Sequence, residues 1–189
     1  QLLTRVIRPV GGRGGSGFVG RHVCQALAER GYRVRVPTRN RERAKKSLIV
    51  LPTVDVVTAD IHDPAALNEV VRGAHAVINL VGVLHDGRGK ASFGEAHVAL
   101  ARKVIAACRA NGVRRVLHMS ALNAAVTGPS AYLRSKGEAE NAVRESGLDF
   151  TIFQPSVIFG REDSFLNLFA RLLQLLPVVF LGSPNARFQ

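Results

Sequence analysis

Short apolar runs rich in β-branched residues alternate along this chain with segments of helical spacing, and this alternation strongly limits the possible folds. The expected strands are 33–37, 54–57, 76–81, 116–119 and 150–153. The expected helices lie between or before them, at 18–30, 64–72, 93–111 and 131–146. Near-continuous apolar strands separated by helices form parallel sheets that are covered on both faces. We therefore expect an α/β fold with a doubly wound parallel sheet, the Rossmann arrangement.

The first strand is a poor match to this pattern. It should lie within 4–10, ahead of a glycine-rich loop, but Arg8 would bury a charge there. Pro9 cannot donate a hydrogen bond to a central ladder. The sequence leaves open whether this strand is irregular.

A glycine-rich motif follows that segment and matches the pattern G-x-G-x-x-G. It consists of Gly14, Gly15, Ser16, Gly17, Phe18, Val19 and Gly20. Such a motif allows a tight turn and points the first amides of a helix at a pyrophosphate. In a chain with 18 glycines it could be an ordinary turn. A helix follows directly, however, and the next strand ends about 20 residues later, where a dinucleotide ribose is recognised. We therefore assign the motif to a dinucleotide site.

The charge distribution first suggests a nucleic-acid partner, because the net charge is +12 and the pI is near 11.1. Residues 1–50 hold 12 Lys and Arg against two acids. Single-strand binders interleave aromatic residues with their cations, but Tyr32 is the only aromatic residue within 30–46. A bound anion explains this concentration of charge as well as a polynucleotide does, and we expect no nucleic-acid partner.

The strand end at 38–41 carries no acid that could bind a 2′-hydroxyl, as an NAD site usually requires. We predict that Arg39 faces a 2′-phosphate, with Asn40 beside it and Arg41 or Arg43 in support. The alternative is a solvated charged loop. The preferred cofactor would be NADP(H), with NAD(H) remaining an option.

Tyr132 and Lys136 are spaced i, i+4, which places both side chains on one helical face. We expect the lysine ammonium to lower the pKa of the phenol and prepare it as a general acid or base. Ser120 follows the strand 116–119, at the edge where open α/β sheets bind ligands. It is a third catalytic candidate, although a strand-end cap is the alternative.

Other site classes are poorly supported. Cys24 and Cys108 lie too far apart in sequence for a disulfide scaffold or a cysteine-built zinc site, and no metal is expected. The histidines lack metal-ligand spacing, so each is expected to be structural: His22, His62, His75, His85, His97 and His118. The apolar run 165–181 is too interrupted to span a membrane, though it could touch one. No secretory signal is apparent.

Five segments occur in order along the chain: GGSGFVG, the Asp60-Ile61 pair, Ser120-Ala121-Leu122, YLRSK at 132–136 and QPSVIFG at 154–160. Together they resemble the extended and atypical short-chain dehydrogenase/reductase superfamily, also called NAD-dependent epimerase/dehydratase proteins. The IFGRED segment at 158–163, with FLN at 165–167, is similar to the branch containing the NAD(P)H-binding accessory subunit of respiratory complex I and its bacterial relatives.

The resemblance implies a role for several residues. The glycines would hold the pyrophosphate, and the remaining residues would follow the cofactor from adenine to nicotinamide: Asp60 and Ile61 at the adenine, Leu80, Val81 and Gly82 near its ribose, Tyr132 and Lys136 at the nicotinamide ribose, and Pro155 to Ile158 at the nicotinamide amide. From its position alone, Asp60 could also belong to a helix N-cap. His97 stands where related enzymes often carry Asn, and Gln154 replaces a common Arg.

These features lead to two hypotheses. The chain is an NAD(P)-dependent oxidoreductase or epimerase that uses Ser120, Tyr132 and Lys136, or it is a non-catalytic NADPH-binding assembly protein of a respiratory or quinone-related complex. We expect a Rossmann domain at 1–160 and, at 161–189, the start of a substrate or interaction region that is otherwise truncated or absent. The expected location is cytoplasmic or peripheral at the inner membrane, on the matrix side in a eukaryote. The small-molecule substrate cannot be named.

Overall fold

The computed structural model describes residues 3–7, 16–40, 51–84, 86–156 and 158. In this part of the chain six parallel strands form one sheet in the order β3-β2-β1-β4-β5-β6. Their bounds are β1 Leu3–Ile7, β2 Arg33–Thr38, β3 Val54–Thr58, β4 Ala76–Asn79, β5 Arg115–Met119 and β6 Asp149–Phe153. This 3-2-1-4-5-6 order is that of the Rossmann fold, and it confirms the predicted fold class.

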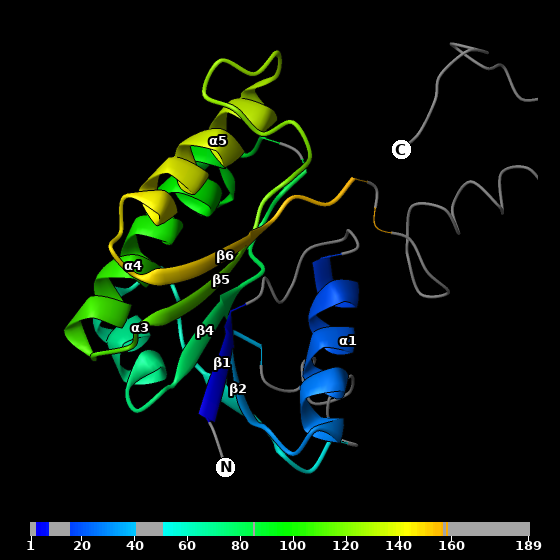
Figure 1. Cartoon of the computed structure of the whole chain (residues 1–189), viewed down its shortest axis with the longest axis vertical. Coiled ribbons are helices and arrows are strands. Elements are labelled where there is room, and N and C mark those ends of the chain that lie inside the picture. Colours follow the sequence, from blue (N-terminus) through cyan, green and yellow to red (C-terminus); the bar gives the residue numbers. More distant parts are fainter. Residues whose placement is uncertain (1–2, 8–15, 41–50, 85, 157, 159–189) are drawn as a thin grey trace, which may run out of the picture.

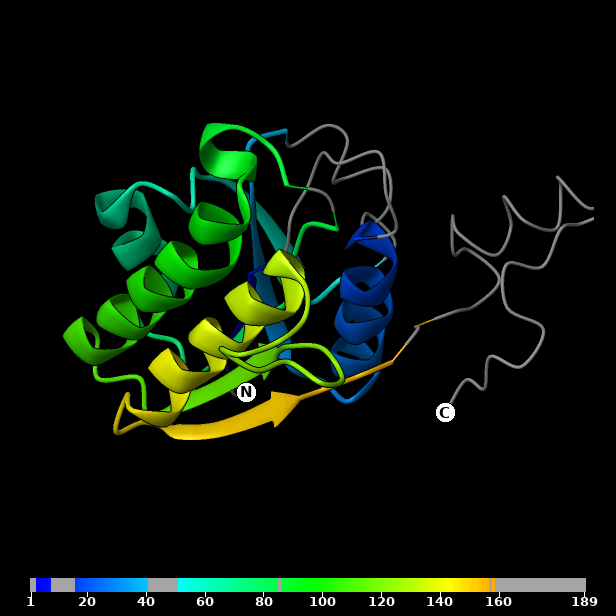
Figure 2. The same cartoon turned by 90° about the horizontal axis from the view of Figure 1, so that it is seen from above.

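The helices cover both faces of the sheet (Figures 1 and 2). Helix α1 (Ser16–Glu29) lies on one face, and α3 (Pro64–Val71), α4 (Leu100–Ala110) and α5 (Ala131–Arg144) lie on the other. Two short helical turns, η1 (Gly89–Ala91) and η2 (Gly94–Ala99), precede α4. Among the described residues, no helix is long and apolar enough to cross a membrane.

The predicted helix boundaries depend on local capping. Asp63 caps α3 by accepting hydrogen bonds from the amides of Ala65 and Ala66, and Pro64 occupies the first turn, as predicted. Gly112 and Gly147 follow helix ends with φ of 66° and 67°. Because residues other than glycine rarely adopt this backbone conformation, both predicted glycine terminations are confirmed.

Two expected elements differ in detail. Strand β1 ends at Ile7, so Pro9 is not part of its ladder, and residues 8–10 lie outside the described residues. The helix expected at 93–111 begins as a π-helical turn, η2, and only continues as an α-helix from Leu100. Such turns insert an extra residue per hydrogen-bonded ring and often occur at functional sites. In η2 the turn carries His97 into the interior.

The core has one cluster on each face of the sheet. Leu67, Leu100 and Val104 belong to the cluster that includes Cys108 and joins the sheet to α3 and α4. The other cluster contains Cys24. Since the two cysteines belong to different clusters and both remain thiols, no disulfide joins them. Burial raises the pKa of Cys108 to about 12, which makes this thiol an unreactive packing group.

Candidate functional site

The strand order reverses between β1 and β4, and open α/β sheets bind ligands at the carboxyl ends of the strands beside such a reversal. Helix α1 begins at Ser16, so Ser16, Gly17, Phe18, Val19 and Gly20 form its first turn. This arrangement supports the predicted role of the helix N-terminus. Gly14 and Gly15 lie outside the described residues.

Lys136 is almost completely buried beside this reversal, at 3% exposure. Its Nζ donates to the carbonyl oxygens of Val81 at 3.4 Å and Met119 at 3.1 Å, so it links the ends of β4 and β5. Gly82 packs directly against the ammonium, because a Cβ at this position would lie 3.0 Å from Nζ. Burial lowers the pKa of Lys136 to about 8, although the Glu140 carboxylate opposes this shift.

Tyr132 lies one helical turn before Lys136, and its ring packs edge-on against Phe93 and His97, with ring centroids 5.8 and 5.5 Å apart. Burial raises the pKa of Tyr132. The expectation that Lys136 lowers it is therefore wrong for this arrangement. The Lys136 ammonium donates its hydrogen bonds to the two strand-end carbonyls. Burial of the phenol therefore determines the direction of the Tyr132 pKa shift.

His97 organises this site through its hydrogen bonds, a structural role of the kind expected for each histidine. The amide of Val83 donates to Nε2 at 3.0 Å, so the proton of the neutral ring is on Nδ1, which donates to Ser135 Oγ at 2.8 Å. Ser135 Oγ then donates to the carbonyl of Tyr132 at 2.8 Å. Burial, with a contribution from Lys136, lowers the pKa of His97 to about 3. The only signal in the sequence was the departure from the Asn of related enzymes.

A second buried pair supports the loop after β4. Asn79 Oδ1 accepts from the amide of Val81 at 3.1 Å, and Asn79 Nδ2 donates to Nδ1 of His118 at 3.2 Å. Burial lowers the pKa of His118 to about 4, so this ring is neutral at pH 7. Both histidines thus act as hydrogen-bonding parts of the scaffold that holds residues 80–83.

Ser120 lies at the end of β5, as predicted, and is 4% exposed. Its neighbour is Glu140 of α5, a buried acid that was not predicted from the sequence. Burial alone would raise the pKa of Glu140, but the Ser120 hydroxyl and the donors of Gln154 and Arg144 lower it. The Gln154 and Arg144 contacts measure 2.8 and 2.7 Å. Gln154, at the position of a common Arg, thus donates a hydrogen bond to this carboxylate, and Arg144 supplies the opposite charge.

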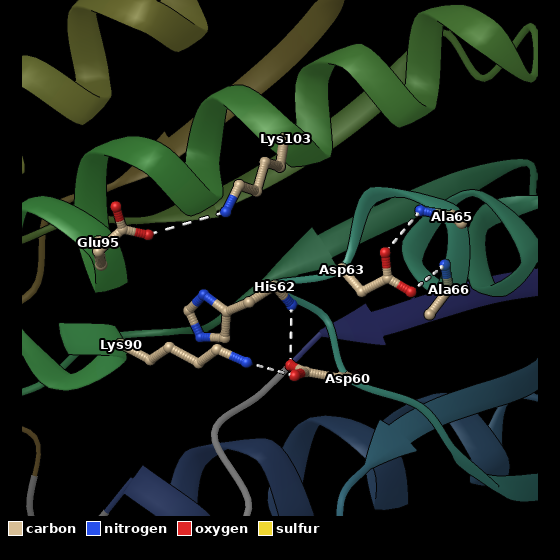
Figure 3. Close-up of polar contacts among 8 residues, drawn as sticks. All are labelled: Asp60, His62, Asp63, Ala65, Ala66, Lys90, Glu95 and Lys103. Carbon is tan, nitrogen blue, oxygen red and sulfur yellow. Dashed lines mark hydrogen bonds and ion pairs between the residues drawn. The ribbon is translucent and has the colours of Figure 1, made fainter.

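The adenine end of the predicted site is shown in Figure 3. Asp60 Oδ1 accepts from the amide of His62 at 3.0 Å, and Oδ2 pairs with Lys90 Nζ at 2.5 Å. The N-cap role considered for Asp60 belongs instead to Asp63. Ile61 packs against the core.

Three other segments that carry predicted site residues follow strands at the same edge. Arg39 and Asn40 are exposed just after β2, where the Asn40 amide donates to Thr38 Oγ1 at 3.0 Å. Leu80 packs against the core below, and Val81 and Gly82 surround Lys136. After β6, the Pro155 carbonyl accepts from the amide of Leu122 at 2.8 Å, and Ile158 is exposed.

The described residues contain no group of three or more His, Cys, Asp and Glu that could hold a metal ion.

Comparison with known proteins agrees with this geometry. The family model described as NAD(P)H-binding matches residues 14–164. "NADH dehydrogenase [ubiquinone] 1 alpha subcomplex subunit 9, mitochondrial" of Arabidopsis thaliana is 33% identical over 93% of this chain and 45% of its own length. "Ceramide reductase" of Caulobacter vibrioides is 36% identical over 92% of this chain and 54% of its own length. The chain thus spans about half the length of these curated relatives.

A solved structure extends the comparison to the fold. The crystal structure of the enzyme WbmH of Bordetella bronchiseptica, in complex with NAD+, superposes with a TM-score of 0.73 at 21% identity. The match covers 92% of this chain and 62% of that one. At this identity the likeness concerns the fold, and it agrees with the observed strand order.

Proposed function

Because the chain belongs to the NAD(P)H-binding family, we propose that it binds NADP(H) in preference to NAD(H) and uses it in oxidoreduction. The observation that carries the cofactor preference is the end of β2. There an exposed Arg39 and Asn40 follow Thr38, and no acid occupies the position that would bind a free 2′-hydroxyl.

The residues present fit a dinucleotide along the carboxyl edge. The first turn of α1 would hold the pyrophosphate through its amides. Arg39 and Asn40 would hold the 2′-phosphate, and Asp60 and Ile61 the adenine. Leu80, Val81 and Gly82 would line the adenine ribose, Tyr132 and Lys136 would contact the nicotinamide ribose, and Pro155 and Ile158 the nicotinamide amide. When bound, the nicotinamide supplies a hydride or accepts one.

The protein's part in catalysis is proton transfer and orientation. Tyr132 is proposed as the proton donor, since its raised pKa keeps the phenol protonated at pH 7. A protonated phenol suits reduction of a carbonyl, in which the substrate oxygen takes up a proton. Ser120 is proposed to bind that oxygen, and Lys136 to hold the strand ends beside the cofactor. An epimerase in the same superfamily would use these residues differently.

The test begins with binding. The affinities for NADPH and NADH are measured by fluorescence titration, first for the wild type and then for Arg39→Asp. We expect the wild type to prefer NADPH and the variant to lose that preference. An unchanged ratio in the variant would contradict the assignment of Arg39.

Turnover is then followed by NADPH absorbance with quinones, aldehydes, ketones and sugar nucleotides. Loss of turnover in Tyr132→Phe, with NADPH affinity retained, supports the enzymatic proposal. Undiminished turnover in this variant excludes Tyr132 as the proton donor.

A second candidate is a non-catalytic, NADPH-binding accessory or assembly role at a respiratory or quinone-related complex. Two observations favour it. Lys136 donates hydrogen bonds to two strand-end carbonyls, and burial raises the pKa of Tyr132, so the phenol is not prepared as a base. A relative named as an NADH dehydrogenase subunit supports it as well. Such a protein would be peripheral at the inner membrane, whereas a reductase could act in the cytoplasm. Tight NADPH binding without turnover of any compound in the panel is the expected result for this role.

We also propose that residues 1–160 form the cofactor domain and that 161–189 begin a substrate or interaction region. The family match over 14–164 is compatible with this division. Limited proteolysis with and without NADPH tests it, because the cofactor should protect the first segment and leave the second unprotected.

A further inference from the structure

The Lys90–Asp60 ion pair joins two loops that are distant in the sheet. Asp60 follows β3, and Lys90 belongs to η1, after β4. Strands β2 and β1 separate β3 from β4. The side chains of Lys90 and Asp60 are 55% and 32% exposed, and ion pairs with this exposure contribute little to stability. The exposed ammonium of Lys90 is therefore also open to a ligand at this edge.

Hydrogen bonds and a glycine turn fix the conformation of the loop that carries Lys90. Asp86 Oδ1 accepts from the amide of Phe93 at 2.8 Å, which closes the loop. Within it, Gly89 adopts a φ of 58°, and its carbonyl accepts from the amide of Ser92 at 2.9 Å. Because glycine adopts a positive φ without steric cost, this turn delivers the Lys90 side chain to a defined position next to Asp60.

That position adjoins Arg39. Strands β2 and β3 pair in register up to Thr38 and Thr58, and the amide of Ala59 donates to the Thr38 carbonyl at 3.0 Å. Arg39 directly follows Thr38, and Asp60 follows Ala59, so both lie just beyond the ends of these paired strands. Arg39, after β2, and Lys90, in η1, thus both lie at the carboxyl edge beside the segment that begins at Asp60.

The electrostatics of His62 agree with this convergence. Figure 3 shows its imidazole between the side chains of Lys90 and Lys103. After burial, which is the largest cause, Lys103, Lys90 and Arg39 all lower the pKa of His62, against the opposing effect of Asp60. Lys103 belongs to α4 and pairs with Glu95 Oε2 at 3.7 Å, whereas Arg39 follows β2 and Lys90 lies in η1. Arg39 and Lys90 are therefore the cations best placed to meet a ligand at the carboxyl edge.

Resting on the proposed function, we propose that Lys90, oriented by Asp60, binds the 2′-phosphate of NADP(H) together with Arg39. A phosphate monoester carries a charge of about −1.5 to −2 at pH 7, more than one guanidinium neutralises. A lysine ammonium has three donors. One is used by Asp60, and the others remain for phosphate oxygens. By sharing its charge, Lys90 also offsets the repulsion between the Asp60 carboxylate and the phosphate.

The test compares wild type, Lys90→Gln, Lys90→Arg and the matched control Lys103→Gln. Dissociation constants are measured by calorimetry for NADPH, NADH, 2′,5′-ADP and 5′-ADP. In Lys90→Gln we expect NADPH and 2′,5′-ADP to bind about tenfold more weakly, as loss of one charge-assisted hydrogen bond implies. NADH and 5′-ADP should change less than about twofold. Lys90→Arg should retain most of the affinity, and Lys103→Gln should behave as wild type.

Equal weakening of all four ligands by Lys90→Gln would place Lys90 at the adenine or the pyrophosphate and overturn the proposal. No weakening of any ligand overturns it too. If Arg39→Asp abolishes NADPH preference while Lys90→Gln leaves it intact, only the role of Lys90 fails. If the wild type binds neither dinucleotide, or binds both equally, the NADP(H) proposal fails first and the role of Lys90 fails with it.

Discussion

Lys136 Nζ donates to the carbonyl oxygen of Met119 over 3.1 Å, so a charged side chain of α5 holds the last residue of β5. A second bond to Val81 extends this link to the loop after β4. The ammonium is buried within the domain, and its position depends on contacts between elements that lie 17 and 55 residues apart in the sequence. This contact determines what Lys136 can contribute to the site.

Replacing Lys136 with Met should change the pH dependence of stability. The pKa of Lys136 falls from an ordinary 10.5 to about 8 in the folded state. Between these values the unfolded chain binds more protons than the folded one, so this residue makes stability rise with pH from about 8 to 10.5. Urea unfolding at pH 7.5, 8.5 and 9.5 should show this rise in wild type and less of it in Lys136→Met. An equal rise in both proteins would contradict the burial of the ammonium.

Gly82→Ala should affect the site more than the fold. The added Cβ would lie 3.0 Å from Lys136 Nζ, the end of a flexible side chain that can shift. We expect a loss of stability no larger than about 1 kcal/mol, with NADPH affinity reduced roughly fivefold. Thermal unfolding and NADPH titration measure the two effects. Gly94→Ala is the control for NADPH binding, because nothing lies within 4 Å of its added Cβ, and it should leave the affinity unchanged.

Gly137→Ala should reduce the stability of the fold more than it reduces NADPH affinity. Here the Cβ would lie 2.3 Å from the carbonyl carbon of Ala125 and 2.6 Å from its Cα, and backbone atoms cannot move aside as a side chain does. We expect a loss of about 2–3 kcal/mol in the free energy of unfolding, typical of overpacking. Urea denaturation measures it. Stability close to that of wild type would show that α5 does not pack against residue 125 as described.

His97→Gln should reduce the sensitivity of the protein to acid. Burial lowers the pKa of His97 from 6.5 to about 3, so only the unfolded chain takes up this proton as the pH falls below about 6.5. The stability associated with the neutral ring is therefore fully present above 6.5 and is lost progressively toward pH 3. His118 acts in the same way with a pKa of about 4, so the variant should keep part of the dependence.

Unfolding midpoints at pH 7.5, 6.0 and 5.0 measure this effect, and the slope should be shallower in His97→Gln than in wild type. Identical slopes in wild type and variant would mean that His97 is already accessible to protons in the folded state.

Much of the fold could be predicted because it depends on local patterns. The strand expected at 33–37 is β2 at Arg33–Thr38, and the helix expected at 64–72 is α3 at Pro64–Val71. Burial of continuous apolar runs, the Asp63 cap and the glycine terminations act within a few residues, so they are visible in the sequence. The i, i+4 spacing of Tyr132 and Lys136 is local for the same reason.

Only the tertiary structure decided what these side chains do. The sequence determined a Rossmann sheet, a glycine motif at the start of α1 and a basic end to β2. It did not indicate that Lys136 bonds to two strand ends, that burial raises the pKa of Tyr132, or that Lys90 meets Asp60. The physical reason is that desolvation, ion pairing and tautomer choice depend on groups far apart in sequence, which meet only when the sheet and its helices have assembled.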